Sequence, residues 1–385
     1  MTSGLLDHLA KAPPAAAALA ALAGESGVWL VGGAVRDLLL GRSPAELDLV
    51  VEGDALAVAL RAAERLGGEV RAHDRFGTAT VRGPGTTFDL AAARRETYAR
   101  PGALPDVELG AGIDADLARR DFTVNALALR LMDGELTGRP DAREDLAAGV
   151  LRVLHDDSFR DDPTRLLRLA RYAGRLGFAV EPRTAELAAA AVAAGALETV
   201  SGERLGAELR RLAREPQPAA LRALERFGVG AALLPGLAVD PGRIERALAL
   251  CPGAARADLV ALCAVAGGVA PERWSVLAFP AADAAAIRAA GALDPPEAAC
   301  SPSQVDAVLR RLPLEVAIVA AADSGPARDW LERARHLRVA ITGHDLLAAG
   351  LSGPAIGRGL ANARAALLDG KAPDRAAQLV VALAT

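Results

Sequence analysis

The chain has 385 residues and a formal net charge of −4; 52% of its residues are hydrophobic and only 3% are aromatic. This length exceeds one ordinary hydrophobic core, so we expect two or more domains, and the abundance of alanine favours helices packed through small side chains. The apolar stretches are interrupted well before the roughly 20 residues of a bilayer span, which excludes a membrane-spanning protein, and the small negative charge argues against nonspecific coating of nucleic acid.

The N-terminal segment, residues 1–25, is expected to form a helix and lacks the basic flank, apolar core and cleavage site of a secretion signal. The three cysteines, Cys251, Cys263 and Cys300, show no close metal-binding spacing, as expected of free thiols in a reducing compartment. Both features predict a cytoplasmic protein.

The pattern of the chain changes near residue 160. Residues 28–155 alternate short β-like runs with helical segments, which predicts an α/β domain. The expected strands are VWLVGG (28–33), LDLVV (47–51), TATVRG (78–83) and TTFDLAAA (86–93), and the expected helices are AVRDLLLG (34–41), DALAVALRAAERLG (54–67) and RDFTVNALALRLM (120–132). Almost every later segment has helical spacing. We predict a head over 1–155, a helical neck over 156–215, and a helical body and tail over 216–385.

The first expected strand ends in Gly32 and Gly33, directly before a helix. Two glycines here let the backbone approach a ligand and leave amide N–H groups at the helix start, a suitable seat for phosphate oxygens. A plain tight turn is the alternative. Arg36 and Asp37 follow one turn into the helix, where Arg36 is in reach of a triphosphate or, alternatively, forms a surface ion pair.

Two acids occupy the next strand. Glu46 and Asp48 are two residues apart, so both carboxylates are expected on one face of an extended strand. Such a pair beside a glycine turn indicates ligands for Mg²⁺, which prefers a couple of carboxylates together with substrate phosphates. Asp89, on a following strand, is a candidate third carboxylate, and a polar strand-end residue is the equally supported alternative.

The ordered motifs resemble one known family. The segments LVGGAVRDLLLG, ELDLVV, RRETY, DLARRDFTVNALA and DDPTRLLRLARYAGRLGF are similar to those of the class II tRNA nucleotidyltransferase and bacterial poly(A) polymerase family. The resemblance covers residues 28–180 closely and extends to SGERLGAELRRL (201–212). It implies a head of the polymerase-β-like nucleotidyltransferase type, with a mixed sheet and helices, followed by an all-α neck, body and tail that bind RNA.

The resemblance assigns roles to the opening motifs. It implies that Gly32, Gly33 and Arg36 hold the nucleotide phosphates and that Glu46 and Asp48 are the catalytic metal ligands. Asp89 is kept as a candidate catalytic carboxylate on the strand pattern alone. The family has Asp where this chain has Glu46. The extra methylene shifts the carboxylate, and we interpret Glu46 as a tolerated variant because it is still an oxygen ligand of the same charge.

The motif RRDFTVN places Asp121 and Asn125 four residues apart, on one face of an expected helix that starts at Arg120. The resemblance implies that these three residues hold the ribose and the triphosphate. The alternative makes Asp121 an N-terminal cap and Asn125 an outward polar residue.

The motif DDPTRLLRLARYAG supports two interpretations. Asp162 before Pro163 is a typical helix start, so capping alone accounts for it. The resemblance implies instead that Asp162 and Arg165 recognise the base, since a carboxylate accepts from an exocyclic amine while a guanidinium donates to the adjacent ring nitrogen. Cytosine and adenine share that pattern, whereas uracil and guanine do not. Arg168 and Arg171 are then phosphate-binding residues or, alternatively, part of a solvated stripe.

These motifs together predict a template-independent enzyme. We expect it to use Mg²⁺ to transfer C and A from CTP and ATP to the 3′ end of tRNA, with release of pyrophosphate. The alternatives are A-only, CC-only or poly(A) addition, a catalytically silent RNA-binding relative, and a small-molecule nucleotidyltransferase. The resemblance implies that CC-only enzymes have a shortened loop in this region, so the full-length segment 94–117 disfavours CC-only activity. The sequence leaves the oligomeric state open.

Overall fold

The computed structural model describes residues 3–73, 77–215 and 218–384. Packing divides the chain into two compact units, Met1–Ser201 and Gly202–Thr385. This boundary lies inside the segment 156–215, so residues 156–201 pack with the head. The three-part division at 155 and 215 stays a prediction, and Pro216 and Gln217 at its second boundary lie outside the described residues.

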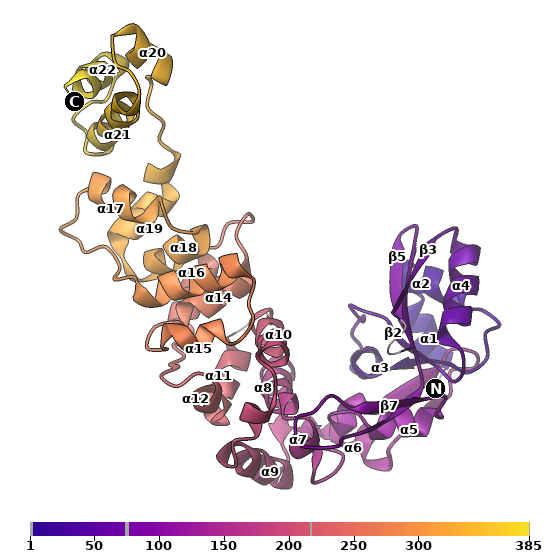
Figure 1. Ribbon diagram of the computed structural model, residues 1–385. Helices are drawn as coiled ribbons and strands as arrows, with labels where there is room; N and C mark the ends of the chain where they lie inside the picture. The colour runs from indigo at the N-terminus through magenta and orange to yellow at the C-terminus, as the bar shows by residue number, and fades with distance from the viewer. Residues whose placement is uncertain (1–2, 74–76, 216–217, 385) are drawn as a thin grey trace. The chain divides into compact units, whose positions relative to one another are not determined.

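The first unit is built on a seven-stranded sheet with strand order β3-β4-β5-β2-β1-β8-β9 (Figure 1). The pair β2–β5 is parallel and the other neighbours are antiparallel, which confirms the expected mixed sheet. The strands are β1 (Val28–Val31), β2 (Asp48–Val51), β3 (Glu69–His73), β4 (Thr78–Gly83), β5 (Thr86–Ala92), β8 (Leu127–Arg130) and β9 (Leu136–Gly138).

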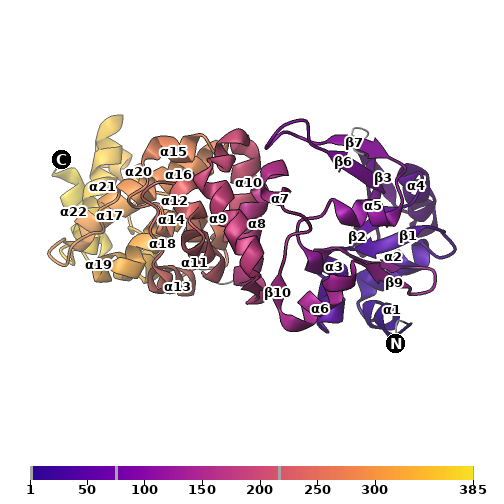
Figure 2. The ribbon, with the colours of Figure 1, turned by 90° about the horizontal axis from the view of Figure 1, so that it is seen from below.

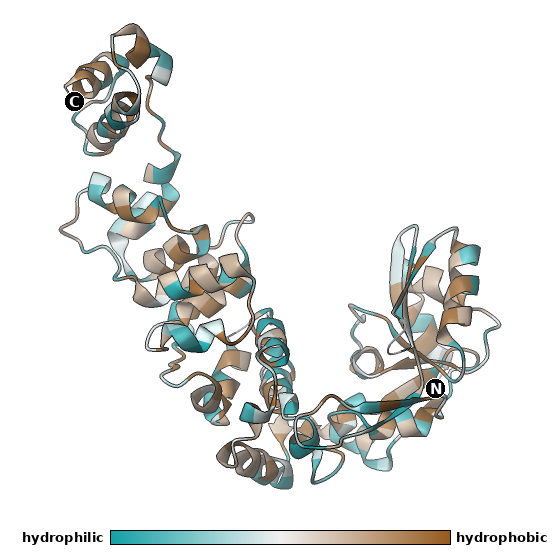
Figure 3. Ribbon diagram, viewed as in Figure 1, coloured by the Kyte–Doolittle hydropathy of each residue, from teal (hydrophilic) through white to brown (hydrophobic). Residues whose placement is uncertain are grey.

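Helices α2 (Pro13–Ala21) and α4 (Ala55–Leu66) cover one face of the sheet. Helix α4 begins where the side chain of Asp54 accepts from the Ala57 backbone N–H and ends at Gly67 in the left-handed conformation. Figure 3 shows both hydrophobic and hydrophilic residues along this helix, and the residues that it buries are Ala55, Val58, Ala59, Ala62 and Ala63. The single helix expected over 1–25 is wrong: Pro13 starts a second helix there, after α1 (Ser3–Leu9).

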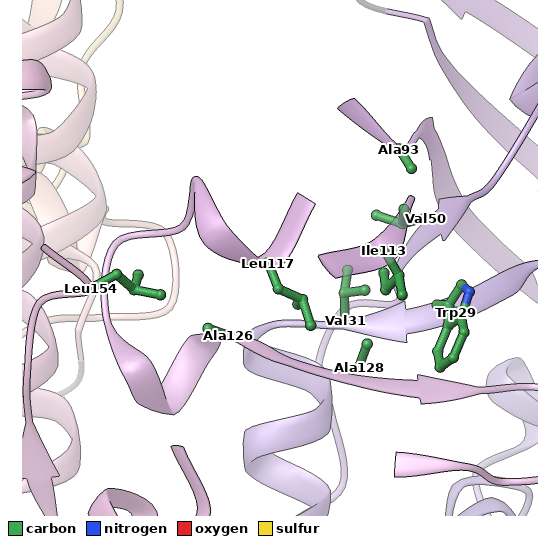
Figure 4. Packing of buried hydrophobic residues seen from close by; sticks show 9 residues of the cluster. All are labelled: Trp29, Val31, Val50, Ala93, Ile113, Leu117, Ala126, Ala128 and Leu154. Atoms are coloured by element: carbon green, nitrogen blue, oxygen red, sulfur yellow. The ribbon is translucent and has the colours of Figure 1, made fainter. Parts of the chain in front are cut away.

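The opposite face of the sheet packs against a short helix, α5 (Ile113–Ala118). Figure 4 shows Ile113 and Leu117 of α5 directed toward Val31 and Val50, in one cluster of buried residues. Trp29 belongs to the same cluster because it lies two residues before Val31 and so shares its face. This packing fixes the chain that follows α5 beside the end of β1.

The helix expected over RDFTVNALALRLM is wrong. The segment forms a 3₁₀ turn, η2 (Thr123–Asn125), followed by strand β8. Leu129 pairs with Leu30 of the central strand β1, and Leu127, Ala128 and Leu129 are all buried. A strand buried on both faces has a continuous apolar run, so its sequence lacks the alternation that distinguishes a strand from a helix.

The rest of the first unit consists of the hairpin β6–β7, the two-stranded sheet β10–β11 and several helices. Figure 2 shows the hairpin β6–β7 beside α5. These elements are α3 (Gly33–Leu39), β6 (Arg94–Thr97), β7 (Asp106–Leu109), α6 (Pro140–Ala148), β10 (Val150–Leu151), α7 (Ser158–Asp161), α8 (Thr164–Leu176), β11 (Ala179–Val180), α9 (Pro182–Ala193) and η3 (Ala196–Thr199).

The described part of the second unit is helical, as expected. Helix α18 packs against α14 and α16 in its core. Asp306 of α17 is joined to α21 by a buried ion pair with Arg364 and to α19 by a hydrogen bond from Trp330. The helices are α10 (Gly202–Ala213), α11 (Ala219–Arg226), α12 (Val229–Leu233), α13 (Pro241–Ala249), α14 (Ala257–Ala264), α15 (Pro271–Ser275), α16 (Ala281–Ala292), α17 (Pro302–Leu309), α18 (Leu314–Asp323), α19 (Gly325–Glu332), η4 (Ala334–His336), α20 (Gly343–Ala348), α21 (Pro354–Leu368) and α22 (Arg375–Leu383). Among the described helices of both units, none combines the length and the apolar character that crossing a bilayer requires.

Candidate active site

The glycine turn follows β1 and needs glycine at its first position. Gly32 has φ of 67°, a conformation that L side chains rarely adopt, and its N–H donates to the Leu127 carbonyl at 3.0 Å. A Cβ on Gly32 would lie 2.5 Å from Nη1 of Arg120. A Cβ on Gly33 would make only an ordinary contact of 3.4 Å with the end of Arg36. Gly32, and not Gly33, is therefore the position of the turn that requires glycine.

Two carboxylates lie side by side at the end of the sheet next to this turn. Asp48 and Asp89 are directly in register on the parallel strands β2 and β5, and both are exposed. The hydroxyl of Thr80, on the next strand, donates to Asp89 at 2.6 Å. Asp48 shares its face with Val50, so the pair lies on the face opposite α2 and α4. This geometry favours the interpretation of Asp89 as a further carboxylate of the site over its interpretation as a polar strand-end residue.

The expected placement of Glu46 and Asp48 on one strand is wrong. Strand β2 begins at Asp48, and Glu46 lies in a bend before it. In the register of β1 with β2, Gly33 would stand opposite Glu46, but the chain has already turned into α3 at that point. Glu46 therefore has no β1 residue to pair with. Its charge still acts on that of Asp48.

The carboxyl of Asp48 carries an electrostatic cost. Its pKa is raised above the usual value, first because neighbouring protein displaces water although the side chain is exposed, and then because Glu46 and Asp89 repel its charge. Arg120 and Arg168 act in the opposite direction without cancelling the rise. Two carboxylates in adjacent register form a donor set that suits a divalent cation. Within residues 3–73, 77–215 and 218–384, no three metal-binding side chains gather into a site by themselves.

Arg36 is a buried residue and forms no surface ion pair. Only 1% of it is exposed, and its Nε and Nη2 donate to Asp37 at 2.9 and 2.7 Å. Its Nη1 donates to the side-chain oxygen of Asn125 at 2.7 Å. Arg36 thus ties helix α3 to the segment that carries Asp121, and these contacts give it a part in positioning the site.

Asp121 and Asn125 meet although they are not on a helix. The Asn125 amide donates to Asp121 Oδ1 at 2.9 Å, and Arg168 of α8 donates to Asp121 Oδ2 at 2.8 and 2.6 Å. Burial alone would raise the pKa of Asp121, but Arg168 and Asn125 outweigh it and lower the pKa to about 2. Neither residue is the outward polar residue or the helix cap of the alternative interpretation.

Arg120 is held by a residue that the sequence interpretation missed. Its Nη2 donates to Asp116 at 2.9 Å, and Asp116 is fully buried. Asp116 lies in α5, and Arg119 and Arg120 follow it by three and four residues, just past the end of the helix. This spacing is the signal in the sequence that points to the contact. Among the described residues, the buried Nε of Arg120 has no hydrogen-bond partner. Burial lowers the pKa of Arg120, and Asp116 opposes this effect.

Asp162 does have the capping contacts. Its Oδ1 accepts from the backbone N–H and the hydroxyl of Thr164 at 3.1 and 2.6 Å, in the first turn of α8. Arg165 is buried and donates to the Ser158 hydroxyl at 2.6 Å and to the Arg119 carbonyl at 2.7 Å. Arg171 lies over the ring of Tyr172. These contacts leave the roles of Asp162, Arg165 and Arg171 toward a nucleotide as predictions.

Two family models match the chain. The model described as the poly(A) polymerase head domain matches residues 28–152. The model described as the probable RNA and SrmB-binding site of polymerase A matches residues 177–240.

Curated proteins with different specificities are similar to the chain. An A-adding tRNA nucleotidyltransferase of Halalkalibacterium halodurans is 46% identical over 214 residues, which is 54% of this chain and 50% of that protein. A CC-adding tRNA nucleotidyltransferase of Deinococcus radiodurans is 45% identical over 219 residues, covering 54% of this chain and 55% of that protein. The chain thus spans about half the length of these curated relatives.

A solved structure matches over a longer range. The apo form of a CCA-adding enzyme is 31% identical, covers 93% of this chain and 91% of its own, and superposes with a TM-score of 0.78. The likeness therefore extends beyond the segments matched by the two family models.

Proposed function

Because the chain belongs to the class II tRNA nucleotidyltransferase and bacterial poly(A) polymerase family, we propose that it adds C and A from CTP and ATP to the 3′ end of tRNA without a template. Pyrophosphate is the leaving group. The observation that carries this proposal is the in-register pair Asp48 and Asp89 beside the Gly32 turn. Carboxylates that can hold a metal ion, next to a glycine turn whose backbone can approach phosphates, are the groups that nucleotidyl transfer uses.

A divalent metal is used generally in this family, and we propose Mg²⁺ as the ion. Asp48 and Asp89 would hold it, with Glu46 as a further oxygen ligand. The ion would assist the attacking 3′-hydroxyl and the leaving pyrophosphate. Two or three carboxylates suit Mg²⁺, because this ion takes its remaining ligands from water and from substrate phosphates. The raised pKa of Asp48 fits this use, since an unbalanced negative charge is relieved by a cation.

The phosphates and ribose of the nucleotide are proposed to lie along the buried network. The backbone of Gly32 and Gly33 approaches the phosphates, and Arg120 supplies positive charge directly beside Gly32. Behind these groups lies a hydrogen-bonded network formed by Arg36, Asn125 and Asp121. The positive charge continues along α8 at Arg168 and Arg171. The unpartnered Nε of Arg120 supports a polar ligand at this point, because a buried N–H without an acceptor is costly.

Base selection is assigned to Asp162 and Arg165. Asp162 accepts from the exocyclic amine of C or A, and Arg165 donates to the neighbouring ring nitrogen. Because UTP and GTP present a carbonyl beside an N–H, they leave both side chains unpaired, and such a mismatch is strongly rejected. The Asp162 contacts with Thr164 orient the carboxylate at the start of α8, so capping and recognition are compatible.

The helical part of the chain is assigned to the RNA. The match to an RNA-binding model over residues 177–240 supports this role, and basic residues of α10 are candidates for phosphate contacts. With 3% aromatic residues, the body is expected to bind RNA by shape and phosphate contacts. We further propose that the protein works in the cytoplasm.

The direct test is single-nucleotide incorporation. Purified protein with Mg²⁺ is incubated with tRNA ending at the discriminator base, at C, or at CC, with one nucleotide present at a time. CCA addition predicts incorporation of C on the first two tRNAs and of A on the third, with no use of UTP or GTP. Failure to extend any of the three tRNAs would overturn the proposal.

A second candidate is an enzyme that adds only the terminal A. The 46% identity with an A-adding relative favours it. This candidate predicts extension of the tRNA ending in CC by A and no incorporation of C on the shorter tRNAs. Repeated addition of A to one RNA would indicate poly(A) synthesis instead.

A further inference from the structure

The hairpin β6–β7 carries a buried carboxylate to which none of the proposed steps assigns a role. The side chain of Glu96 is 7% exposed, although it lies on a two-stranded hairpin of mostly polar sequence. Its Oε1 accepts from Arg94 Nε at 3.0 Å and from Arg119 Nη1 at 3.0 Å, and its Oε2 accepts from the Tyr98 hydroxyl at 3.1 Å. Glu96 therefore gathers three donors at the point where the hairpin meets the end of α5.

Arg119 is the link from this carboxylate to the proposed base-recognition pair. Its guanidinium is held on one edge by Asp116, through Nε and Nη2 at 3.0 and 2.7 Å, and at Nη1 by Glu96. Its backbone carbonyl accepts from Arg165 Nη2 at 2.7 Å. The two carboxylates thus hold the Arg119 side chain from opposite sides and constrain the position of the carbonyl that Arg165 contacts.

Besides a long contact of 3.5 Å from Nη1 to the Ser158 carbonyl, the orientation of Arg165 depends on two close acceptors. One is the Ser158 hydroxyl, at 2.6 Å from Nη1, and the other is the Arg119 carbonyl. A planar guanidinium bound at both terminal nitrogens is fixed in direction as well as in position. Movement of the Arg119 carbonyl therefore rotates the plane of Arg165.

The hairpin itself is anchored beyond Glu96. The N–H of Gly102 donates to the Arg160 carbonyl at 3.3 Å, and a Cβ on Gly102 would lie 2.1 Å from the Thr199 hydroxyl oxygen. Burial, followed by the Glu96 charge, raises the pKa of Tyr98 to about 12. The Tyr98 hydroxyl therefore keeps its proton and remains a donor to Glu96 at neutral pH.

We propose that Glu96 is a positioning residue that sets the direction of Arg165 through Arg119, and thereby sets the preference for C and A over U and G. This inference rests on the proposed function. It assigns to the hairpin a role in nucleotide selection that is distinct from metal and phosphate binding. The hydrogen-bond donors to Glu96 are Arg94, Tyr98 and Arg119, and none of them is among the residues proposed to bind the metal or the phosphates.

The test compares Glu96→Gln with the matched control Glu108→Gln. Glu108 lies on the same hairpin, loses the same charge, and pairs with Arg95 only at the exposed surface. The readout is the ratio of kcat/KM for CTP over UTP and for ATP over GTP, on tRNA ending in C and in CC. We expect this ratio to fall about tenfold in Glu96→Gln while kcat for CTP and ATP stays within about threefold of the parent. The ratio stays at the parent value in Glu108→Gln.

Two further variants separate positioning from folding. Glu96→Asp keeps the charge and is expected to retain most of the selectivity. Arg119→Lys breaks the same link from the other side and is expected to lose selectivity, with no added loss when it is combined with Glu96→Gln. Should Glu96→Gln fail to fold in a thermal unfolding measurement, Arg119→Lys carries the test.

The outcomes distinguish this inference from the function on which it rests. Parent-like selectivity in folded Glu96→Gln or Arg119→Lys overturns the role of Glu96 and leaves the proposed function intact. Equal loss in Glu108→Gln also overturns it. A parent protein that transfers no nucleotide, or does not prefer CTP and ATP, overturns the proposed function itself.

Discussion

Arg120 packs so closely on Gly32 that Nη1 lies 2.5 Å from the position a Cβ on that glycine would occupy. The turn after β1 and the motif that follows α5 are therefore built as one unit, although they lie far apart in the sequence. Because Gly32 also has a positive φ, both the backbone and the packing exclude a side chain at this position.

The first prediction compares the two glycines of the turn. Gly32→Ala is expected to destabilise the protein by at least about 1–2 kcal/mol, because alanine must adopt a positive φ and push Arg120 aside. Gly33→Ala serves as the control, since its φ is not positive and its Cβ would make only an ordinary contact of 3.4 Å with the guanidinium of Arg36. The measurements are urea unfolding and the KM for ATP. Equal stability of the two variants would contradict the structural role of Gly32.

The second prediction concerns the carboxylate pair. Asp48→Asn is expected to reduce nucleotide incorporation by at least about 100-fold with little change in stability, because the exposed side chain contributes its charge to the site. Glu46→Asp is expected to keep or improve activity. Turnover is measured with Mg²⁺ on tRNA ending in CC, and tRNA binding serves as the control. Parent-like turnover by Asp48→Asn would remove the metal assignment.

The third prediction concerns acid stability. The pKa of Asp121 is about 2 in the folded protein and ordinarily 3.8, so the folded state favours the carboxylate. Its contribution of about 2 kcal/mol is present above pH 4 and is lost as the pH falls from 4 toward 2. Asp121→Asn lacks this term, so its free energy of unfolding should fall less steeply over that range. Identical slopes for the parent and the variant in urea titrations would contradict the ion pair with Arg168.

The fourth prediction separates capping from recognition at Asp162. Asp162→Asn keeps an acceptor for the Thr164 N–H, so stability is expected to stay within about 0.5 kcal/mol, whereas Asp162→Ala should cost about 1 kcal/mol. Both variants are expected to lose selectivity for CTP and ATP over UTP and GTP. An unchanged ratio of specificity constants in Asp162→Asn would return this residue to capping alone.

The fifth prediction concerns the buried ion pair of the second unit. Arg364 donates to both carboxylate oxygens of Asp306 at 2.7 Å, and Trp330 donates to the same carboxylate. Arg364→Ala leaves a buried charge without its counter-ion and should cost about 3–5 kcal/mol in unfolding free energy. Arg333→Ala, which removes an exposed pair with Asp329, is the control and should cause no measurable change. A small effect of Arg364→Ala would show that α21 is held by other contacts.

The sequence predicted the parts of the site that depend on local pattern. The glycine turn, the strand that carries Asp48 and the strand that carries Asp89 each have a period or a turn signal within a few residues. The register that places Asp48 beside Asp89 depends on the pairing of two strands that are distant in the sequence. The sequence alone therefore could not show that these two carboxylates are neighbours.

The features that the sequence did not predict depend on distant partners. Burial of Arg36 follows from Asn125, 89 residues away, and an arginine one turn into a helix is usually at the surface. Glu46 falls outside β2 because β1 ends at the turn, which is a property of the neighbouring strand. Arg165 takes its direction from the Arg119 carbonyl, 46 residues earlier, and no local pattern records such a contact.

The adjacency of Asp48 and Asp89 also affects how the protein tolerates heat. Two like charges in neighbouring register repel, and this repulsion adds to the loss of solvation that is the main cause of the raised pKa of Asp48. A bound cation and nucleotide relieve it, and by mass action any ligand that binds only the folded form raises the midpoint of thermal unfolding. Under the proposed function, the melting temperature of this protein is therefore expected to rise with the concentrations of divalent ion and nucleoside triphosphate around it.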